Sequence, residues 1–168
     1  MEVGVALKKM WESGYIDKNT VLSMAVRNGD IKIVRFLLDN ETEIGFRFQE
    51  AAYHGHLDIV LLFLERGMNI HGPHDYGNGA LRDASSQGHI EIVELLLNNG
   101  LYINYQNGSI LSVALGGGHL KVVRLLLERG VDYRDYYTGL KKLLRVKKLP
   151  ESREELIDLV TVNTVNSE

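Results

Sequence analysis

Apolar residues recur along the chain with helical spacing, and one pattern of them is written four times. The four stretches are GDIKIVRFLL (29–38), GHLDIVLLFL (55–64), GHIEIVELLL (88–97) and GHLKVVRLLL (118–127). Each begins at a glycine and continues with apolar residues three and four positions apart, which predicts an amphipathic helix. Two of the stretches are followed by ERG and one by NNG. Because glycine commonly follows the last helical turn, each predicted helix ends there.

A second apolar pattern precedes each of these repeat glycines. A leucine or phenylalanine is followed three residues later by an alanine, and the glycine comes four residues after that alanine. The pairs are Leu22–Ala25, Phe48–Ala51, Leu81–Ala84 and Leu111–Ala114. Each unit is therefore expected to contain a short first helix, a glycine turn and a second helix.

The repetition predicts how these helix pairs assemble. One helix pair is too thin to bury its apolar faces, whereas stacked pairs bury them against their neighbours. A repeat in fixed register favours such a solenoid over an ordinary helical bundle, whose core needs no internal repeat. The intervals between repeat glycines are 26, 33 and 30 residues, so the connections between units are expected to differ in length.

The repeated Gly-His-Leu-x-x-Val-x-x-Leu-Leu pattern resembles the ankyrin-repeat family over about residues 1–138. That family has a repeat of about 33 residues with a T-P-L-H-x-A signature. At the signature this chain departs, with TVLS (20–23), FRFQ (46–49), GALR (79–82) and SILS (109–112). Only Thr20 keeps the threonine and no unit keeps the histidine, which puts the family's Thr–His hydrogen bonding between repeats in question. The third unit, ALR-x-A-S-x-x-GH-x-E-x-V, resembles ankyrin proteins expanded in giant DNA viruses of amoebae.

The resemblance implies an all-α repeat solenoid, in which short β-hairpin or loop fingers join helix-turn-helix units. We expect a single domain over residues 1–168. Its predicted parts are a half-repeat cap at 1–14, central repeats at 20–41, 46–67, 79–100 and 109–130, a divergent cap at 138–162 and a tail at 163–168. In the first cap, Met10 and Trp11 occupy positions where other units place leucine, so both are expected in the core.

The predicted fingers are uneven. Only the interval from Gly55 to Gly88 has the full repeat length, and its finger at 70–79 contains Gly-Asn-Gly, which is typical of a turn. The finger after Leu38 is nearly absent, because its interval is about seven residues shorter than the family repeat. The finger at 70–79 is therefore the place where we expect the most distinctive contact.

Composition narrows the class of protein. The net charge of −3 gives the whole chain no attraction to nucleic acid or anionic membranes. There is no cysteine, which excludes disulfides and thiolate sites. The N-terminus has no run of signal-peptide type, and no apolar stretch approaches the roughly 18 residues that span a bilayer. We expect an intracellular monomer, cytoplasmic or nuclear, and in the host cell if the protein is viral.

The sequence predicts no catalytic residue, no metal and no cofactor, and hence no enzyme. His56, His89 and His119 each follow a repeat glycine, which favours a structural role at the start of the second helix. His71, His74 and Asp75 can in principle ligate zinc, but two histidines in a loop without cysteine are more often simply polar. Gly-x-Ser-x-Gly, the phosphate-binding Gly-x-x-x-x-Gly-Lys and His-Glu-x-x-His motifs are all absent.

A binding surface remains, and we expect a non-catalytic protein-protein interaction module that acts as adaptor, competitor or inhibitor. On the ankyrin pattern, the concave face comprises the two residues before each repeat glycine and the finger tips. The predicted partner-binding residues are Arg27, Asn28, Tyr53, His54, His74, Asp75, Tyr76, Asn78, Ser86, Gln87, Tyr105, Gln106, Tyr136 and Tyr137. The many tyrosines favour recognition, because tyrosine is enriched in interface hot spots.

One alternative function is binding of nucleic acid or an acidic partner through the run KKLLRVKK (141–148), which has five basic residues in eight. The run is followed at once by acidic residues and contains no interleaved aromatic residue. Both features favour a solvated cap helix, so the protein-binding reading is preferred and nucleic acid is not an expected partner.

Overall fold

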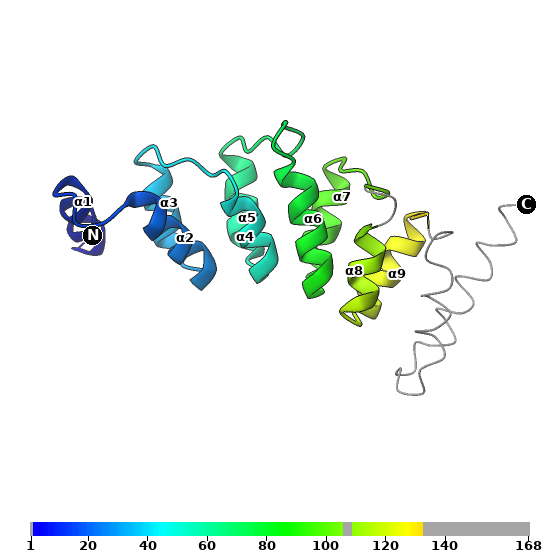
Figure 1. The fold of residues 1–168 in the computed structure, drawn as a ribbon. Helices are drawn as coiled ribbons and strands as arrows, with labels where there is room; N and C mark the ends of the chain where they lie inside the picture. The colour runs from blue at the N-terminus through cyan, green and yellow to red at the C-terminus, as the bar shows by residue number, and fades with distance from the viewer. Residues whose placement is uncertain (1, 106–108, 133–168) are drawn as a thin grey trace, which may run out of the picture. The chain divides into compact units, whose positions relative to one another are not determined.

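The computed structural model describes residues 2–105 and 109–132 of the chain. These residues form nine α-helices and no strand (Figure 1), in agreement with the predicted all-α repeat class. The helices are α1 (Glu2–Glu12), α2 (Lys18–Asn28), α3 (Ile31–Leu38), α4 (Arg47–His54), α5 (Leu57–Glu65), α6 (Tyr76–Gln87), α7 (Ile90–Asn98), α8 (Ser109–Gly116) and α9 (Leu120–Glu128). We call α2, α4, α6 and α8 the first helices and α3, α5, α7 and α9 the second helices.

A glycine separates the two helices of each pair, as the repeat predicts. Gly29 has a φ of 72°, and its N–H and that of Asp30 close the last turn of α2. This left-handed conformation favours glycine, which has no Cβ to clash with the carbonyl. The Asp30 side chain then accepts from the N–H of Ile33 at 3.1 Å and caps α3. The turn therefore ends one helix and begins the next within two residues.

The start of α2 is fixed by a side-chain cap. The Asp17 carboxylate accepts hydrogen bonds from the Thr20 N–H at 2.8 Å and from the Thr20 hydroxyl at 3.0 Å. These two donors hold the pKa of the Asp17 carboxyl below its ordinary value. The cap satisfies a backbone donor that has no partner inside the helix.

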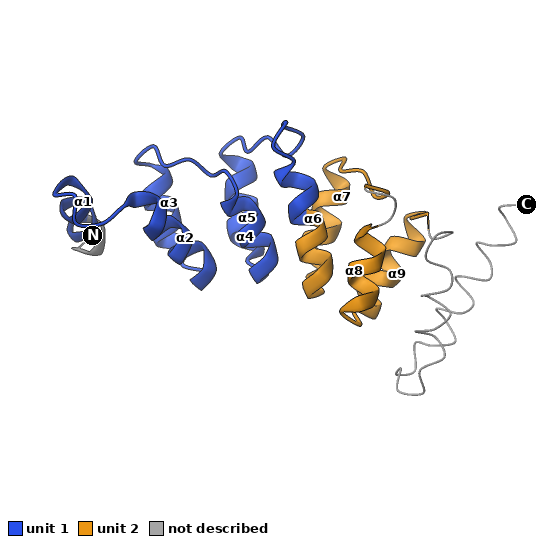
Figure 2. Cartoon of the chain, in the orientation of Figure 1, with its two compact units in different colours: residues 1–80 blue, residues 81–168 orange. Residues whose placement is uncertain are grey.

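The chain divides into two compact units, residues 1–80 and 81–168 (Figure 2). In the first unit, α2 packs on α3 and α4 packs on α5, while α2 also contacts α4 and α3 contacts α5. The core of this unit contains Leu22, Leu37, Phe48 and Phe63, all fully buried, and the two phenylalanine rings lie 6.5 Å apart. The apolar stripes read from the sequence are therefore the faces that the stack buries.

The second unit contains most of α6, followed by α7, α8 and α9. Here α8 packs on α9, and α9 packs on α7. Leu81, Leu96, Leu111 and Leu126 are fully buried, and they come one from each of the four helices. The same alternation of first and second helices thus builds the core of both units.

The N-terminal helix α1 buries only one of the two residues that were predicted in its core. Trp11 is partly buried, with its ring 5.7 Å from that of Phe36 and the Lys18 ammonium 5.0 Å above it. Met10, however, is 36% exposed, so its predicted place in the core is wrong. Adjacent residues of a helix point about 100° apart. When Trp11 faces Phe36, Met10 is turned away from the stack.

The finger predicted at 70–79 is wrong in its second half. The loop ends at Asp75, and Tyr76 begins α6, so Gly77 and Gly79 lie in a helical turn rather than at a hairpin tip. A Cβ on Gly77 would overlap the carbonyl oxygen of Ile70, and a Cβ on Gly79 would overlap the side chain of Gln49. The two glycines are therefore explained by close packing around the helix and not by turn geometry.

Candidate functional site

The ends of the first helices are held in place by a contact between successive repeats. His56 lies at the start of α5, and its Nε2 is 3.0 Å from the carbonyl oxygen of Arg27 in the preceding repeat. In the same way, Nε2 of His119 is 2.8 Å from the carbonyl oxygen of Ser86. The two imidazoles do not cap their own helices. Both histidines therefore have the structural role that their position predicted.

Each of these two imidazole rings also lies over the repeat glycine of the preceding repeat. A Cβ on Gly29 would come within 2.7 Å of the His56 ring, and a Cβ on Gly88 would overlap the His119 ring. We call the two pairs Gly29–His56 and Gly88–His119 the Gly–His links. They join neighbouring repeats in a chain that lacks the Thr–His pair of the family signature.

In the first unit, Arg27 forms an ion pair across successive repeats. Both Nε and Nη2 of Arg27 donate to Oε1 of Glu50 on α4, at 2.9 and 2.8 Å. Arg27 was predicted as a partner-binding residue, and its side chain remains largely exposed above this pair. Glu50 was not predicted. Opposite charges on adjacent first helices were the available signal, since Arg27 stands two residues before Gly29 and Glu50 five before Gly55.

Aromatic and imidazole rings gather beside this ion pair at the end of α4. Tyr53 is 45% exposed, and its ring meets that of His54 edge-on with centroids 5.2 Å apart. The His54 ring stacks against that of His56 at 6.1 Å. We call Arg27, Glu50, Tyr53, His54 and His56 the helix-end cluster. Four predicted residues lie in or beside it, because exposed Asn28 directly follows Arg27.

Met24 extends the exposed surface of α2 one turn further. It is 58% exposed, while Leu22, Ala25 and Val26 on the same helix are buried. Sequence reasoning missed Met24 because it counts as apolar. Its position outside the Leu22–Ala25 stripe was the signal that it faces away from the core.

The finger residues of the first unit form a second group. The rings of His74 and Tyr76 lie 5.5 Å apart, with His74 exposed and Tyr76 half-buried. Asp75 between them has a φ of 59°, and its carboxylate accepts a hydrogen bond from the Asn78 amide at 2.6 Å. All four predicted residues are thus close together, with Tyr76 and Asn78 on the first turn of α6 rather than on a loop tip.

A groove of about 580 Å³ opens beside this group, between the loop that follows α3 and the loop that follows α5. The two loops leave the helix pairs of the first unit at the same end (Figure 1). We call this the finger groove, and its lining residues are Leu38, Thr42, Glu43, Ile44, Gly45, Arg66, Gly67, Met68, Asn69, Gly72, Pro73, His74 and Tyr76. Of the residues predicted from the sequence, His74 and Tyr76 line it.

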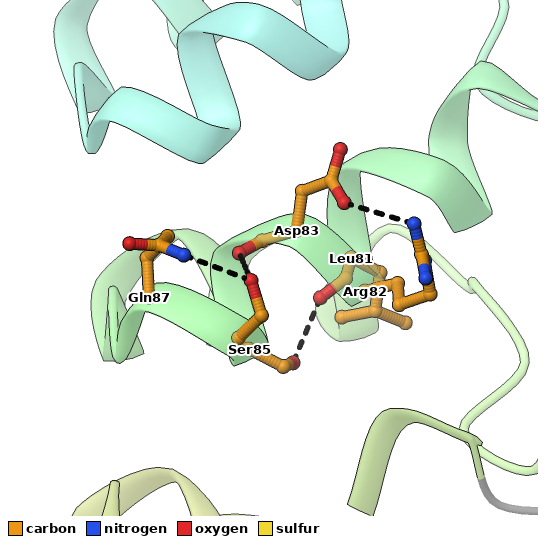
Figure 3. Close-up of polar contacts among 6 residues, drawn as sticks. Leu81, Arg82, Asp83, Ser85 and Gln87 are labelled. Carbon is orange, nitrogen blue, oxygen red and sulfur yellow. Dashed lines mark hydrogen bonds and ion pairs between the residues drawn. The ribbon is translucent and has the colours of Figure 1, made fainter. Parts of the chain in front are cut away.

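In the second unit, the predicted residues Ser86 and Gln87 end α6 and take part in hydrogen bonds within that helix. Figure 3 shows Gln87 together with Leu81, Asp83 and Ser85 of the same helix. The Ser86 hydroxyl donates to the Asp83 carbonyl oxygen at 2.8 Å, and the Gln87 amide donates to the Ser86 hydroxyl at 3.2 Å. Gln87 is exposed and Ser86 half-buried, so Gln87 is the more accessible of the two. The buried Ser85 donates to the Leu81 carbonyl oxygen and belongs to the core.

Asp83 is a further polar residue of this helix that sequence reasoning missed. Burial raises the pKa of its carboxyl, and the Arg82 guanidinium, 3.5 Å away, opposes the shift. Desolvation therefore outweighs the attraction of the neighbouring cation.

The remaining predicted residues fall in the loop after α7 and beyond. Tyr105 is half-buried, and its N–H donates to the carbonyl oxygen of Tyr102, an exposed tyrosine that was not predicted. Gln106, Tyr136 and Tyr137 lie outside the described residues. So do the basic run 141–148, the predicted cap at 138–162 and the tail at 163–168.

The described side chains offer no metal site. Over residues 2–105 and 109–132, no three or more His, Cys, Asp or Glu side chains come together in a way that could hold a metal ion. This includes His71, His74 and Asp75. The same part of the chain contains no helix with the length and apolar character needed to cross a membrane.

Two family models match this chain. A model of three consecutive ankyrin repeats matches residues 48–137, and a model of a single ankyrin repeat matches residues 17–45. Comparison with curated proteins finds no significant match. The three-repeat match alone covers more than half of the sequence, and the helix pairs with their Gly–His links accompany it. The chain therefore belongs to the ankyrin-repeat family.

Proposed function

We propose that this protein is a non-catalytic module that binds another protein through the ends of its first helices and its fingers. Ankyrin repeats are in general protein-protein interaction modules, which supports the class of function. The observation that supports the location is the helix-end cluster, where the exposed Tyr53 ring lies against that of His54 and Arg27 is hydrogen-bonded to Glu50 of the same helix α4. It acts by occupancy, as an adaptor, a competitor or an inhibitor of its partner.

The geometry of the helix-end cluster is suited to recognition. Tyrosine provides a large contact area with few rotatable bonds, and tyrosine and arginine are enriched in binding hot spots. Here both side chains stand on short helices that are tied together by the Arg27–Glu50 ion pair and by the His56 hydrogen bond. A rigid support lowers the entropy lost when a partner binds.

The finer aspects of the function are proposals that rest on the sequence. The protein acts inside a cell, in the cytoplasm or nucleus, and it is related to the ankyrin proteins of giant DNA viruses of amoebae. A monomeric state belongs with them, because an open binding surface needs no second copy.

The test is a titration of the partner recovered by affinity purification with the whole chain as bait. Tyr53→Ala, Tyr76→Ala and Tyr105→Ala are each expected to weaken binding by about 1–3 kcal/mol, as truncation of hot-spot residues does. Thermal unfolding of each variant measures any accompanying loss of stability.

Two exposed residues of the second helices provide the matched controls. Glu91→Ala on α7 and Lys121→Ala on α9 are expected to change binding by less than about 0.5 kcal/mol. If these two substitutions weaken binding and the tyrosine substitutions do not, the partner binds the second helices and the proposed surface is wrong.

A further inference from the structure

We propose that Asn28–Gly29 is a modification site, at which the asparagine is deamidated without an enzyme once the end of α2 opens, and that the Gly29–His56 link keeps it closed. The site lies where α2 ends, and Asn28 is exposed there. The inference goes beyond the proposed function, because it concerns the covalent chemistry of the chain itself. It is carried by the dipeptide, by the hydrogen bonds that hold it and by the ring that covers it.

The reaction joins the side chain of Asn28 to the backbone of Gly29. A base from the solvent removes the proton of the Gly29 N–H, and this nitrogen attacks the side-chain carbonyl carbon of Asn28. A carbon–nitrogen bond forms in a succinimide ring, and the bond to Nδ2 breaks, so that ammonia leaves after it takes up a proton from the solvent. Water then opens the ring at either carbonyl group and produces aspartate or isoaspartate. Glycine favours the attack, because it has no side chain to obstruct its nitrogen.

The closed end of α2 keeps the Gly29 nitrogen out of this reaction. Its N–H donates to the carbonyl oxygen of Val26 at 3.1 Å, and the N–H of Asp30 donates to that of Ala25 at 2.9 Å. Asn28 belongs to the last helical turn, where a side chain leans toward the start of the helix and the following backbone nitrogen points the other way. The nitrogen can therefore attack only after this turn has opened.

The next repeat holds the turn closed from outside α2. Nε2 of His56 is 3.0 Å from the carbonyl oxygen of Arg27, the residue directly before Asn28. The same ring covers Gly29, since a Cβ on that glycine would come within 2.7 Å of it. The Arg27 guanidinium is also fixed by Glu50, at 2.8 and 2.9 Å. The residues on both sides of Asn28 are thus anchored to the following repeat, and local opening of the turn breaks these contacts.

Two other Asn–Gly pairs among the described residues allow a comparison within the chain. In Asn78–Gly79, inside α6, the glycine N–H donates to the carbonyl oxygen of Asp75 at 3.0 Å, and the asparagine amide donates to the carboxylate of the same residue at 2.6 Å. In Asn99–Gly100, at the end of α7, the glycine N–H donates to the Leu97 carbonyl oxygen at 3.0 Å. Neither pair contains the glycine of a Gly–His link, so their rates of deamidation are not expected to depend on His56.

Modification of Asn28 changes the charge of the helix-end cluster. The product has a carboxylate one residue after Arg27, at the end of a helix, where negative charge is unfavourable. Isoaspartate also lengthens the backbone by a methylene group just before Gly29, whose φ is 72°. We therefore expect the modified end of α2 to remain open more often than the natural one.

The experiment measures deamidation of the whole chain at mildly alkaline pH, by peptide mapping with mass spectrometry. The natural chain is incubated with and without urea. Without urea, Asn28 should be modified at least about tenfold more slowly than in urea, because the end of α2 opens rarely in the folded chain. His56→Ala should raise the rate at Asn28 about fivefold in the absence of urea, since it removes the hydrogen bond and the covering ring.

The matched control is His119→Ala. It removes the same kind of hydrogen bond, at 2.8 Å, from the Gly88–His119 link, whose glycine follows Gln87 rather than an asparagine. The rate at Asn28 should change by less than about twofold in this variant, because the two sites are distant and share no partner. Asn99 is the control within each molecule. Unfolding of the whole His56→Ala chain would raise its rate as well, whereas opening of α2 alone does not.

The inference is overturned if Asn28 stays unmodified in urea, or if it is modified equally fast with and without urea. An unchanged rate at Asn28 in His56→Ala also overturns it, as do equal increases in His56→Ala and His119→Ala. If His56→Ala raises the rates at Asn28 and Asn99 by the same factor, the Gly29–His56 link stabilises the chain as a whole, and its proposed protection of Asn28 is wrong.

Discussion

The second helices are nearly identical from repeat to repeat, whereas the loops between repeats differ. α5, α7 and α9 each contain nine residues, begin after a histidine and have nearly the same cap geometry, with φ near −80° and ψ near 75° at that histidine. The loops that follow α3 and α5 differ in length, since they comprise residues 39–46 and 66–75. Each has one non-glycine residue with a left-handed backbone, but Glu41, at a φ of 61°, lies inside its loop and Asp75, at a φ of 59°, ends its loop.

This difference indicates that the second helices support the structure and that the loops are the parts free to vary for recognition. A second helix has a neighbour on either side of the stack, so its length and apolar positions are constrained at every turn. A loop faces solvent and tolerates changes in length. The finger groove lies between two such loops, where that constraint is weakest, and partner specificity is expected there.

The largest expected effect on stability distinguishes two leucines that both belong to second helices. Leu96→Ala on α7 truncates a fully buried side chain, and we expect it to lower the free energy of unfolding by about 2–5 kcal/mol. Leu61 on α5 also belongs to a second helix but is 40% exposed, so Leu61→Ala should change it by about 0.5 kcal/mol or less. Denaturant midpoints of the two variants measure this, and an unchanged midpoint for Leu96→Ala would refute the assignment of α7 as a core helix.

A smaller effect tests the Gly–His link. Gly88 and Gly130 both have a left-handed φ, of 80° and 78°, so alanine at either position is expected to destabilise by about 1–2 kcal/mol. A Cβ on Gly88 would also overlap the His119 ring, whereas Gly130 has no atom within 4 Å of that position. Gly88→Ala should therefore cost about 1 kcal/mol more, because the His119–Ser86 hydrogen bond is disturbed. Equal midpoints in thermal unfolding would show that the link contributes nothing.

A still smaller effect concerns a carboxyl on a first helix. The pKa of the Asp83 carboxyl is raised in the folded state, so the protonated carboxyl is favoured there. Its contribution to the free energy of unfolding is therefore complete below the ordinary pKa near 3.8, and it is lost as the pH rises through the folded-state pKa. At neutral pH we therefore expect Asp83→Asn to be more stable than the natural chain by about 0.5 kcal/mol. The gain should vanish in acid. Unfolding curves recorded across this pH range decide it, and a variant that is less stable at pH 7 would contradict the sign.

The smallest expected effect is none. A chelator should leave the thermal midpoint within error, since residues 2–105 and 109–132 contain no group of three or more His, Cys, Asp or Glu side chains that could hold a metal ion coupled to folding. A fall of the thermal midpoint by several degrees would instead support a metal site at His71, His74 and Asp75. The loop after α5 would then stabilise the fold through a metal ion, which the second helices do not do.

The parts that sequence reasoning predicted are those with local causes. The helix after each repeat glycine follows from apolar spacing alone, and Leu96 and Leu126 are buried where that spacing puts them. Tyr53 and His54 lie exposed at the end of α4, directly before Gly55, as the register of the repeat indicates.

The parts that were missed depend on contacts between distant residues. Gly77 and Gly79 suggested a turn, and only the approach of Ile70 and Gln49 explains why they stand in a helix. Arg47 is buried although it is charged, with Nη1 donating to the Glu43 carbonyl oxygen at 3.3 Å and Nη2 to that of Asn19 at 3.2 Å. No local pattern identifies such partners, so the sequence alone does not predict them.

The Gly–His link has a consequence for how such a chain can grow. The second, third and fourth central repeats each contain Gly-His at the start of the second helix, so each carries the two residue types that form the Gly–His links. Duplication or deletion of one of these repeats therefore keeps a glycine and a histidine at each new junction, whatever the length of the loop that comes with it. An inserted copy of residues 88–117 would bring its own Gly88 and His89 into register with its neighbours. Whole repeats of this kind can be added or exchanged, and the loops between them can change in sequence and length while the Gly–His links are kept.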